Sequence, residues 1–321
     1  MKRDKINKFF SRIPKHIIIL FVLVIWITPT LGLLITSLRP VQDINTSGWW
    51  MILKPRDDIA SQQNLPKFTL NNYIDALVGY RGTRNYVSDC ENGTAPLDMR
   101  CNAADILNPR GMIRALLNSL IVTIPATILP ILFAAFAGYA FSWLDFKGRT
   151  LLFASLVGLQ VVPLQMTMVP ISRAYSTLGL NGTFLGVWLF HTGFGMPYAI
   201  YLMRNFLGSL PKDLFESAYL DGASHWTAFV QLAIPLAIPA IASLGIFQFL
   251  WVWNDLLVSL VFLGGTKPVI TYQIANMVSS LGAGWHLLTA AAFLSMLLPI
   301  VVFFALQKYF VKGMLAGAVK G

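Results

Sequence analysis

Very few side chains in this 321-residue sequence stand in patterns that support covalent chemistry. The four histidines are far apart, and no cluster of His and Cys has the spacing of zinc ligands. No nucleotide-binding loop of the G-x-x-x-x-G-K-S/T type occurs, and the run G-G-T-K at 264–267 lacks its spacing. Protease and hydrolase motifs of the H-E-x-x-H and G-x-S-x-G types are also missing. We therefore expect no enzyme, no catalytic residue, no metal and no cofactor bound by this chain.

Asp255 is the acidic residue that we place inside an apolar stretch, within the run W-V-W-N-D at 251–255. An ionisable residue in such a stretch is a functional candidate, and it could carry protons in an ion-coupled transporter. A carrier of that kind usually has further residues of this type and paired internal repeats, and the sequence has neither. Asn254 could hold Asp255 by hydrogen bonding. The pattern therefore favours a structural role or a place on a solute pathway.

Amide side chains on the apolar segments, such as Gln165 and Gln248, are a second group of candidates. Amides can meet the hydroxyl groups of a polar solute. They also hold helices together inside a membrane. The sequence leaves both interpretations open.

The stretch 210–239, L-P-K-D-L-F-E-S-A-Y-L-D-G-A-S-H-W-T-A-F-V-Q-L-A-I-P-L-A-I-P, has the pattern of helix, turn and helix. Pro211 suits a first helical turn, Gly222 suits the left-handed residue that ends a helix, and Ser224 suits the N-cap of the next one. Apolar residues recur at helical spacing and form a stripe at Leu214, Phe215, Ala218 and Tyr219. A loop this short has no core of its own. The stripe must therefore lie against the rest of the chain or dock into a partner.

Composition indicates an integral membrane protein, because 56% of the residues are hydrophobic and only 12% are charged, against about 25% charged in soluble domains. The formal net charge of +10 comes from basic residues that flank the apolar segments, as in the N-terminal 16 residues and the turn at 145–149. This distribution is typical of loops on the cytoplasmic side of a membrane. It argues against nucleic-acid binding.

The apolar segments predict an all-α fold with six transmembrane helices and both termini in the cytoplasm. The N-terminal segment 1–16 would be cytoplasmic, 17–38 the first span, and 39–111 an extracytoplasmic loop or cap. The segment 112–321 would hold the core of the protein, with a cytoplasmic loop at 210–232 and a tail at 307–321. We place its five spans at 112–143, 151–171, 184–203, 234–263 and 285–306.

Cys90 and Cys101 both fall in the segment that we place outside. A disulfide between them would contribute about 3 kcal/mol by restricting the unfolded loop. Oxidising surroundings would permit it. Two free thiols are the alternative.

Several motifs resemble those of binding-protein-dependent ABC importer permeases. E-S-A at 216–218, D-G-A at 221–223, Phe229 and I-P at 234–235 are similar to the E-A-A-x-x-D-G-A signature, with Ser217 where the family has alanine. The resemblance extends to F-T-L-N-N-Y at 68–73, N-S-L at 118–120, V-P-L-Q at 162–165 and W-N-D at 253–255. The tail at 311–321 resembles that of the second permease subunit of maltose-type importers. The run H-T-G-F-G-M-P at 191–197, with the long loop after the first helix, is most similar to α-glucoside or glucosylglycerol permeases.

This resemblance implies a permease of the type I importer fold in the inner membrane of a bacterium, in contact with lipid. Its partners would be a homologous permease in a heterodimer, two ATPase subunits that bind ATP and Mg²⁺, and an extracytoplasmic solute-binding protein. Sugar would be the substrate, with a polyol or another osmolyte as the alternative, and an ion-coupled carrier using Asp255 or a membrane anchor as further alternatives.

The resemblance also assigns residues to roles. The coupling helix that docks into the ATPase would use Leu214, Phe215, Glu216, Ser217, Ala218, Asp221, Gly222 and Ala223. The translocation pathway would use Gln165, Gln248, Asn254 and Asp255. The C-terminal contact with the ATPase would use Lys312, Gly313, Gly317 and Lys320.

Overall fold

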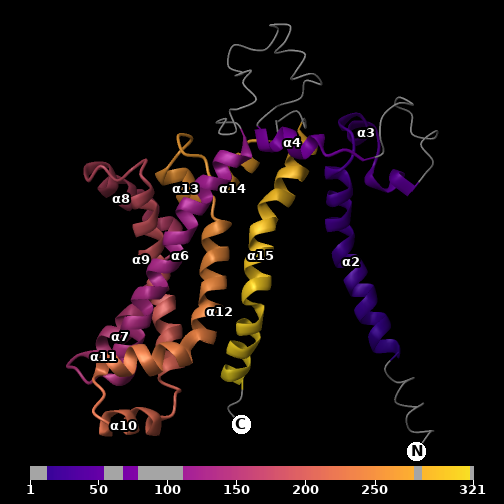
Figure 1. Cartoon of the computed structure of the whole chain (residues 1–321). Coiled ribbons are helices and arrows are strands. Elements are labelled where there is room, and N and C mark those ends of the chain that lie inside the picture. The colour runs from indigo at the N-terminus through magenta and orange to yellow at the C-terminus, as the bar shows by residue number, and fades with distance from the viewer. Residues whose placement is uncertain (1–12, 54–67, 79–110, 278–283, 319–321) are drawn as a thin grey trace, which may run out of the picture. The chain divides into compact units, whose positions relative to one another are not determined.

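The computed structural model describes residues 13–53, 68–78, 111–277 and 284–318, and side chains from 15 to 309 within these ranges. Every regular element in these ranges is helical (Figure 1). The chain divides into two compact units, one of residues 1–112 with 276–294 and one of residues 113–275 with 295–321. Helices α6 and α15 contribute residues to both units. The two units are described separately.

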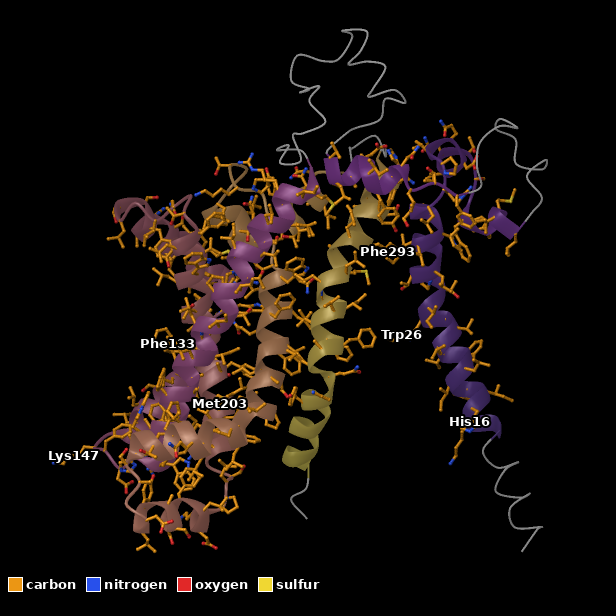
Figure 2. The ribbon with its side chains drawn as sticks, in the orientation of Figure 1. His16, Trp26, Phe133, Lys147, Met203 and Phe293 are labelled. Atoms are coloured by element: carbon orange, nitrogen blue, oxygen red, sulfur yellow. The ribbon has the colours of Figure 1, made fainter. Side chains whose placement is uncertain are left out.

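The first unit contains α2 (Ile13–Ser37), α3 (Val41–Thr46), the 3-10 helix η1 (Trp49–Leu53) and α4 (Asn71–Val78). The indole of Trp49 packs directly on Gly32 of α2, where a Cβ atom would lie 2.8 Å from the indole nitrogen. Figure 2 shows Trp26 projecting from the same helix, and 78% of its side chain is exposed. An apolar helix with so little cover is suited to lipid.

The segment after α2 is held by two buried polar side chains. The Arg39 guanidinium donates to the backbone oxygens of Asp43 at 2.9 Å and Ser47 at 3.1 Å. The amide nitrogen of Asn72 donates to the backbone oxygens of Ser37 at 2.9 Å and Arg39 at 2.8 Å. Burial lowers the pKa of Arg39, and the nearby Asp43 carboxylate partly offsets this shift. These bonds fix α4 against the end of α2 by satisfying carbonyl groups that a helix end leaves unpaired.

The second unit contains most of α6 (Met112–Trp143), then α7 (Arg149–Leu159), α8 (Leu164–Thr177), α9 (Phe184–Leu207) and α10 (Lys212–Leu220). There follow α11 (His225–Ala228), the π-helical turn η3 (Phe229–Ala233), α12 (Ile234–Trp253), α13 (Leu257–Phe262), α14 (Ile270–Ala275) and the later part of α15 (Trp285–Ala318). Side-chain bonds join α6 to α9 and to α12, from Trp188 to the oxygen of Ile121 and from Gln248 to that of Ala126. In Figure 1, α10 lies at one end of this bundle, and α8 and α13 lie at the other.

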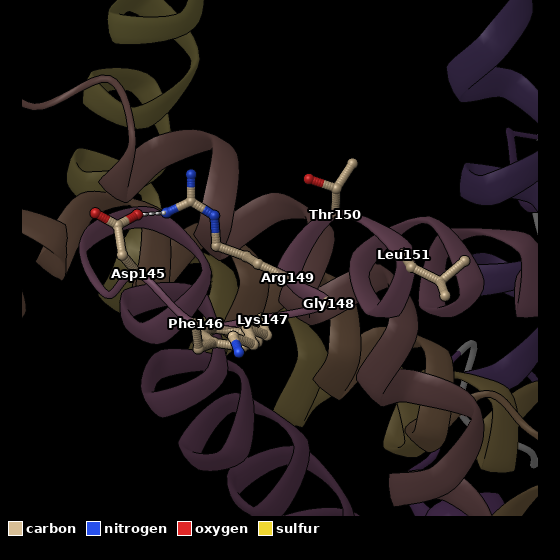
Figure 3. Close-up of a pocket in the computed structure, with 7 residues that line it drawn as sticks. All are labelled: Asp145, Phe146, Lys147, Gly148, Arg149, Thr150 and Leu151. Carbon is tan, nitrogen blue, oxygen red and sulfur yellow. Dashed lines mark hydrogen bonds and ion pairs between the residues drawn. The ribbon is translucent and has the colours of Figure 1, made fainter.

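The turn between α6 and α7 lies at the α10 end of the bundle, as Lys147 in Figure 2 shows. Arg149 pairs with Asp145 at 3.0 Å (Figure 3). It also donates to the backbone oxygen of Leu144 at 3.0 Å. Gly148 has a positive φ of 83°, which a glycine adopts without strain. The basic turn predicted at 145–149 is therefore a compact loop that closes on itself.

Within the described ranges, four helical stretches are long and apolar enough to cross a membrane, namely Lys15–Ser37, Met112–Trp143, His225–Trp253 and Trp285–Tyr309. Helices α7 and α8 would form a fifth span if they are taken together, although they are bent by 98°. The all-helical membrane fold is thus confirmed. The count of six spans and the cytoplasmic position of both termini stay predictions.

Two predicted spans are interrupted. The sequence predicted one helix over 151–171, but α7 ends at Leu159 and α8 begins at Leu164. Pro163 has no N–H to continue the helix, and it disfavours helical geometry at the residue before it. The sequence also predicted one span over 234–263, but α12 ends at Trp253. Asp255 therefore lies between α12 and α13 and not inside a span.

Two buried apolar clusters hold the second unit together. The cluster near α10 includes Tyr139 and Phe141 of α6, Met203 and Leu207 of α9, Phe215 of α10 and Phe229 of η3. The other includes Val122, Met168, Phe190, Val252, Val258 and Phe262, from α6, α8, α9, α12 and α13. The first cluster positions the candidate site.

Candidate functional site

Helix α10 has well-defined ends that its sequence explains. Pro211 stands one residue before the helix, at the N-cap. At the other end, the N–H groups of Gly222 and Ala223 bond to the oxygens of Tyr219 at 3.0 Å and Ala218 at 2.9 Å. This pair of bonds is the Schellman motif, and it places Gly222 at a positive φ of 86°. The glycine turn predicted from the sequence is confirmed.

The helix that follows is capped as predicted. The hydroxyl oxygen of Ser224 accepts a hydrogen bond from the backbone N–H of Thr227 at 3.1 Å. From there α11, η3 and α12 run on as one helical stretch from His225 to Trp253. The turn at 221–224 is therefore the joint between α10 and a helix that is long enough to cross the membrane.

The inner face of α10 is fixed to the bundle by Phe215. This side chain is fully buried, and its ring stacks on that of Trp143 at the end of α6, with centroids 3.8 Å apart and an angle of 23° between the planes. The indole nitrogen of Trp143 donates to the backbone oxygen of Leu207 at the end of α9. Burying a phenylalanine ring contributes about 1.5–3 kcal/mol. Phe215 thus joins α10 to the ends of two long helices.

A hydrogen-bonded group of three side chains makes a second attachment. The Tyr219 hydroxyl lies 3.1 Å from the Tyr139 hydroxyl and 3.1 Å from Nδ1 of His225. The Tyr139 hydroxyl also donates to the backbone oxygen of His225 at 3.1 Å. These bonds connect α10, α11 and α6. A displacement of α10 would therefore move α6 and α11 with it.

The opposite side of α10 is open. We call it the outer face of α10, and it consists of Leu214, Glu216, Ser217, Leu220, Asp221 and Gly222, all exposed. Leu220 is 89% exposed, although the neighbouring Tyr219 contacts Tyr139 and His225. The carboxylates of Glu216 and Asp221 make no hydrogen bond or ion pair with any residue in the described ranges. An apolar side chain flanked by unpaired acids can receive a partner with an apolar pocket and basic groups.

The stripe predicted from periodicity is therefore divided between the two sides. Phe215 and Tyr219 attach α10 to its own bundle, Ala218 is half-buried, and Leu214 is 47% exposed. Leu220, which the periodicity did not single out, is the more exposed leucine. The sequence indicated its exposure only indirectly, because Leu220 lies one helical turn after Glu216 and directly before Asp221, and acidic residues usually face solvent.

The candidate pathway residues do not form one cluster. Gln248 is buried and donates to the backbone oxygen of Ala126 at 3.1 Å, so it joins α12 to α6. Gln165 is exposed near the start of α8. Asn254 donates to the backbone oxygen of Leu250 at 2.8 Å and closes the end of α12.

Asp255 acts as a helix cap. Its Oδ2 accepts the backbone N–H groups of Val258 at 2.9 Å and Ser259 at 3.4 Å, at the start of α13. Nε2 of His191 lies 3.9 Å from the same oxygen. The His191 ring is fully buried. The structural interpretation of Asp255 therefore has direct geometric support.

Some predicted residues lie outside the described parts of the chain. Cys90, Cys101 and Lys320 are among the residues that the structure does not describe. Lys312, Gly313 and Gly317 fall in α15, but no side chain beyond residue 309 is described. Within the described ranges, no three His, Cys, Asp or Glu side chains are grouped so that they could hold a metal ion.

The second unit is thus a bundle of apolar helices with a short helix fixed across one end and the outer face of that helix exposed. The chain belongs to the family described as binding-protein-dependent transport system inner membrane component, whose model matches residues 108–316. It is therefore a permease component of an ABC transporter, and it is a multi-pass protein of the inner membrane. The resemblance seen in the sequence is confirmed.

Two relatives match nearly the whole chain. The osmoprotective compounds uptake permease GgtD of Synechocystis is 49% identical over 316 residues, which cover 98% of this chain and 94% of the relative. The alpha-glucoside transport system permease AglG of Rhizobium meliloti is 40% identical over an alignment of 366 residues, which covers 95% of this chain and 96% of the relative. Both alignments include the long segment after the first span.

A solved structure shares the fold. It is that of a bacterial ABC transporter involved in the import of the acidic polysaccharide alginate, with a TM-score of 0.63 and 17% sequence identity. The match covers 95% of this chain and 97% of that one. At this level of identity the likeness concerns the fold of the permease core and not its substrate.

Proposed function

We propose that this chain is one of two permease subunits of an ATP-driven importer of sugars or other small glycosides. Its partners would be a homologous permease, two ATPase subunits that hold ATP and Mg²⁺, and an extracytoplasmic solute-binding protein. The observation that carries the proposal is α10, which has an anchored inner face and an open outer face on a chain without a nucleotide-binding loop. The relatives named for α-glucosides, for osmoprotective compounds, and for melibiose, raffinose and stachyose support the substrate class.

The proposed mechanism transmits force and involves no covalent step on this chain. Closure of the ATPase pair on ATP would displace α10 through its outer face, namely Leu214, Glu216, Ser217, Leu220, Asp221 and Gly222. Phe215 and Tyr219 would pass the displacement to α6, while the turn through Ala223 would pass it to α11 and α12. Coupling requires that α10 bind the two states of the ATPase with different affinity, because equal affinity would shift no equilibrium.

The remaining assignments follow the same scheme. The core at 112–321 would carry the pathway, to which Gln165, Gln248, Asn254 and Asp255 would contribute, and 210–232 would be its cytoplasmic coupling loop. The segments 17–38 and 39–111 would be the first span and an outer cap that contacts the binding protein. The N-terminal residues 1–16 and the tail at 307–321 would be cytoplasmic, with Lys312, Gly313, Gly317 and Lys320 directed to the ATPase.

Reconstitution in proteoliposomes tests the proposal. The complete transporter should take up maltose, trehalose or sucrose with ATP and loaded binding protein, and should take up none with a proton gradient alone. Uptake that persists after every ATPase subunit is omitted would refute it. A panel that includes glucosylglycerol and sorbitol separates sugars from osmolytes, since binding to the solute-binding protein ranks the candidates directly.

A further inference from the structure

Helix α9 is flanked by two pockets that share Phe194 and Tyr198. One pocket, of about 380 Å³, lies between α9 and α12 and is lined by Gly195, Phe247, Gln248 and Trp251. The other, of about 440 Å³, lies between α9 and the bend that joins α7 to α8, and it includes Gln160, Thr167 and Gly193. Because Phe194 and Tyr198 border both, we treat the pockets as one region and call it the α9 groove.

The groove contains exposed aromatic side chains from α9 and α12, with Tyr198 and Phe247 in the middle of their helices and Trp251 two residues before the end of α12. Tyr198 is 46% exposed, Phe247 is 48% exposed and Trp251 is 37% exposed. The Tyr198 hydroxyl and the Trp251 indole N–H make no hydrogen bond with any residue that the structure describes. In the same unit, the indoles of Trp143, Trp188 and Trp253 each donate to a backbone oxygen, whereas the exposed indole of Trp226 makes no hydrogen bond with a described residue.

Unpaired hydrogen-bond donors limit what the groove can face. A hydroxyl or indole N–H that is transferred to an apolar medium without a partner loses several kcal/mol of hydration in alkane-like surroundings. The hydrocarbon core of a membrane contains no group that could accept a hydrogen bond from Tyr198, which lies in the middle of α9. Water or a polar solute would satisfy both donors.

The same set of groups matches the chemistry of a sugar ring. A pyranose has an apolar face of C–H groups, which packs on an aromatic ring, and a rim of hydroxyls, which needs hydrogen-bond partners. Trp251 supplies a ring face, while Tyr198 and the exposed amide of Gln160 supply polar groups. A Cβ added at Gly193 would meet no atom within 4 Å, so the backbone of α9 is open to a ligand there.

We propose that the α9 groove is a glycosyl-contact site, in which Trp251 stacks on a sugar ring and Tyr198 bonds to its hydroxyls. The site rests on the proposed function, since it gives this subunit direct contacts with the transported solute. The partner permease and lipid are the competing occupants. Both would exclude water from Tyr198 in the assembled transporter.

Thiol labelling decides whether the groove contains water. Tyr198→Cys and Leu189→Cys are a matched pair, because the side chains are equally exposed, at 46% each, and nine residues place them about 180° apart on α9. In a background lacking the native cysteines, a charged methanethiosulfonate reacts only with a hydrated thiolate. We expect Tyr198→Cys in the assembled transporter to react at least about tenfold faster than Leu189→Cys, and maltose, trehalose or sucrose to slow it during turnover. Equal, slow labelling would mean that lipid or the partner covers the groove, and the proposal would be overturned.

A functional measurement separates contact with the sugar from a general structural role. Tyr198→Phe and Trp251→Phe remove one hydrogen-bonding group each, so sugar uptake at saturating loaded binding protein should fall about two- to tenfold. ATP hydrolysis stimulated by the binding protein should change less than uptake, whereas a folding defect would lower both. Ile238→Ala is the control, since Ile238 is 45% exposed and lies about 180° from Phe247 on α12.

The outcomes distinguish this inference from the function on which it rests. If the wild-type transporter imports sugar with ATP while Tyr198→Phe and Trp251→Phe import at the wild-type rate, only the glycosyl-contact site is refuted. If the wild-type transporter imports no sugar with ATP, the proposed function fails and the glycosyl assignment fails with it. In that case the labelling of Tyr198→Cys still shows whether the groove is open to water.

Discussion

Replacing Phe215 by alanine should detach α10 from the end of the bundle while leaving the long helices in place. Phe215 is the fully buried side chain of α10, and its ring stacks on that of Trp143 at 3.8 Å. The remaining attachment is the hydrogen-bonded group of Tyr219, Tyr139 and His225. Loss of the ring would leave a cavity between α10 and α6 that the short helix cannot fill.

The size of the effect follows from the burial of the ring. Truncation of a buried phenylalanine costs about 3–5 kcal/mol. We take the lower end, because α10 is short and can settle toward α6. About 3 kcal/mol corresponds to a roughly hundredfold increase in the population in which α10 is open.

Hydrogen exchange measured by mass spectrometry on peptides that cover 212–220 reports this population directly, since protected amides exchange through local opening. In detergent-solubilised full-length chain, the amides of α10 should exchange roughly a hundredfold faster in Phe215→Ala than in the wild type, while peptides from α9 change little. Exchange in α10 that stays within about threefold of the wild type would refute the assignment of Phe215 as the anchor.

Leu220→Ala is the matched control on the same helix. Leu220 is 89% exposed, so its truncation removes almost no intramolecular contact and should leave exchange in α10 unchanged. It should weaken binding of the ATPase subunits by about tenfold, as expected for one apolar contact at an interface. If both variants speed exchange equally, the distinction between the inner and outer faces of α10 is incorrect.

Three further predictions concern other joints of the fold. Gly222→Val should abolish sugar uptake while membrane insertion stays normal, because the φ of 86° at this position is strained for a β-branched residue. Gly158→Ala is the control and should have no effect, since a Cβ there also meets no atom within 4 Å. Uptake assays and immunoblots of the membrane fraction check both variants. Asp255→Asn should keep at least about half of wild-type uptake, because an amide oxygen still caps α13, whereas a proton carrier would lose activity entirely. Asn72→Leu should raise proteolysis after α2 by leaving the buried oxygens of Ser37 and Arg39 unpaired, at a cost of about 1–3 kcal/mol each.

A fourth measurement concerns the cysteines. If Cys90 and Cys101 are bridged, alkylation without reductant should leave the mass of the chain unchanged. Two added labels would show that both thiols are free.

The turn chemistry around α10 was predictable because it is local. Gly222 and Ser224 act on backbone groups within a few residues of themselves, so their roles can be seen in a short stretch of sequence. The family signature at 216–223 is of the same kind. It identified the class of protein before any contact was known.

The direction in which α10 faces could not be predicted in the same way. Helical spacing showed which residues share a side, but Phe215 meets Trp143, and Tyr219 meets Tyr139. These partners are about 70 to 80 positions earlier in the chain, so only the tertiary structure identifies them. Leu220 has no intramolecular partner, and a periodicity argument passes over it.

The interrupted spans show the limit of hydropathy. Apolar composition continues across the breaks at 160–163 and after Trp253, so a window of about 19 residues averages over them. The breaks come from Pro163 and from the cap formed by Asp255, and each acts only on backbone groups within a few residues. The sequence did not predict the α9 groove for a different reason, since Tyr198 and Trp251 are brought together only by the packing of α9 against α12.

The π-helical turn η3 has a consequence for how the length of this chain can vary. The N–H of Ile234 bonds to the oxygen of Phe229, five residues back, so this turn holds one residue more than an α-helical turn. A chain with one residue fewer between 229 and 233 could close an ordinary turn there, and α11 and α12 would keep their directions. The same deletion inside α12 would rotate every later side chain by about 100°. A one-residue deletion at η3 should therefore disturb the packing of α12 less than a deletion within α12.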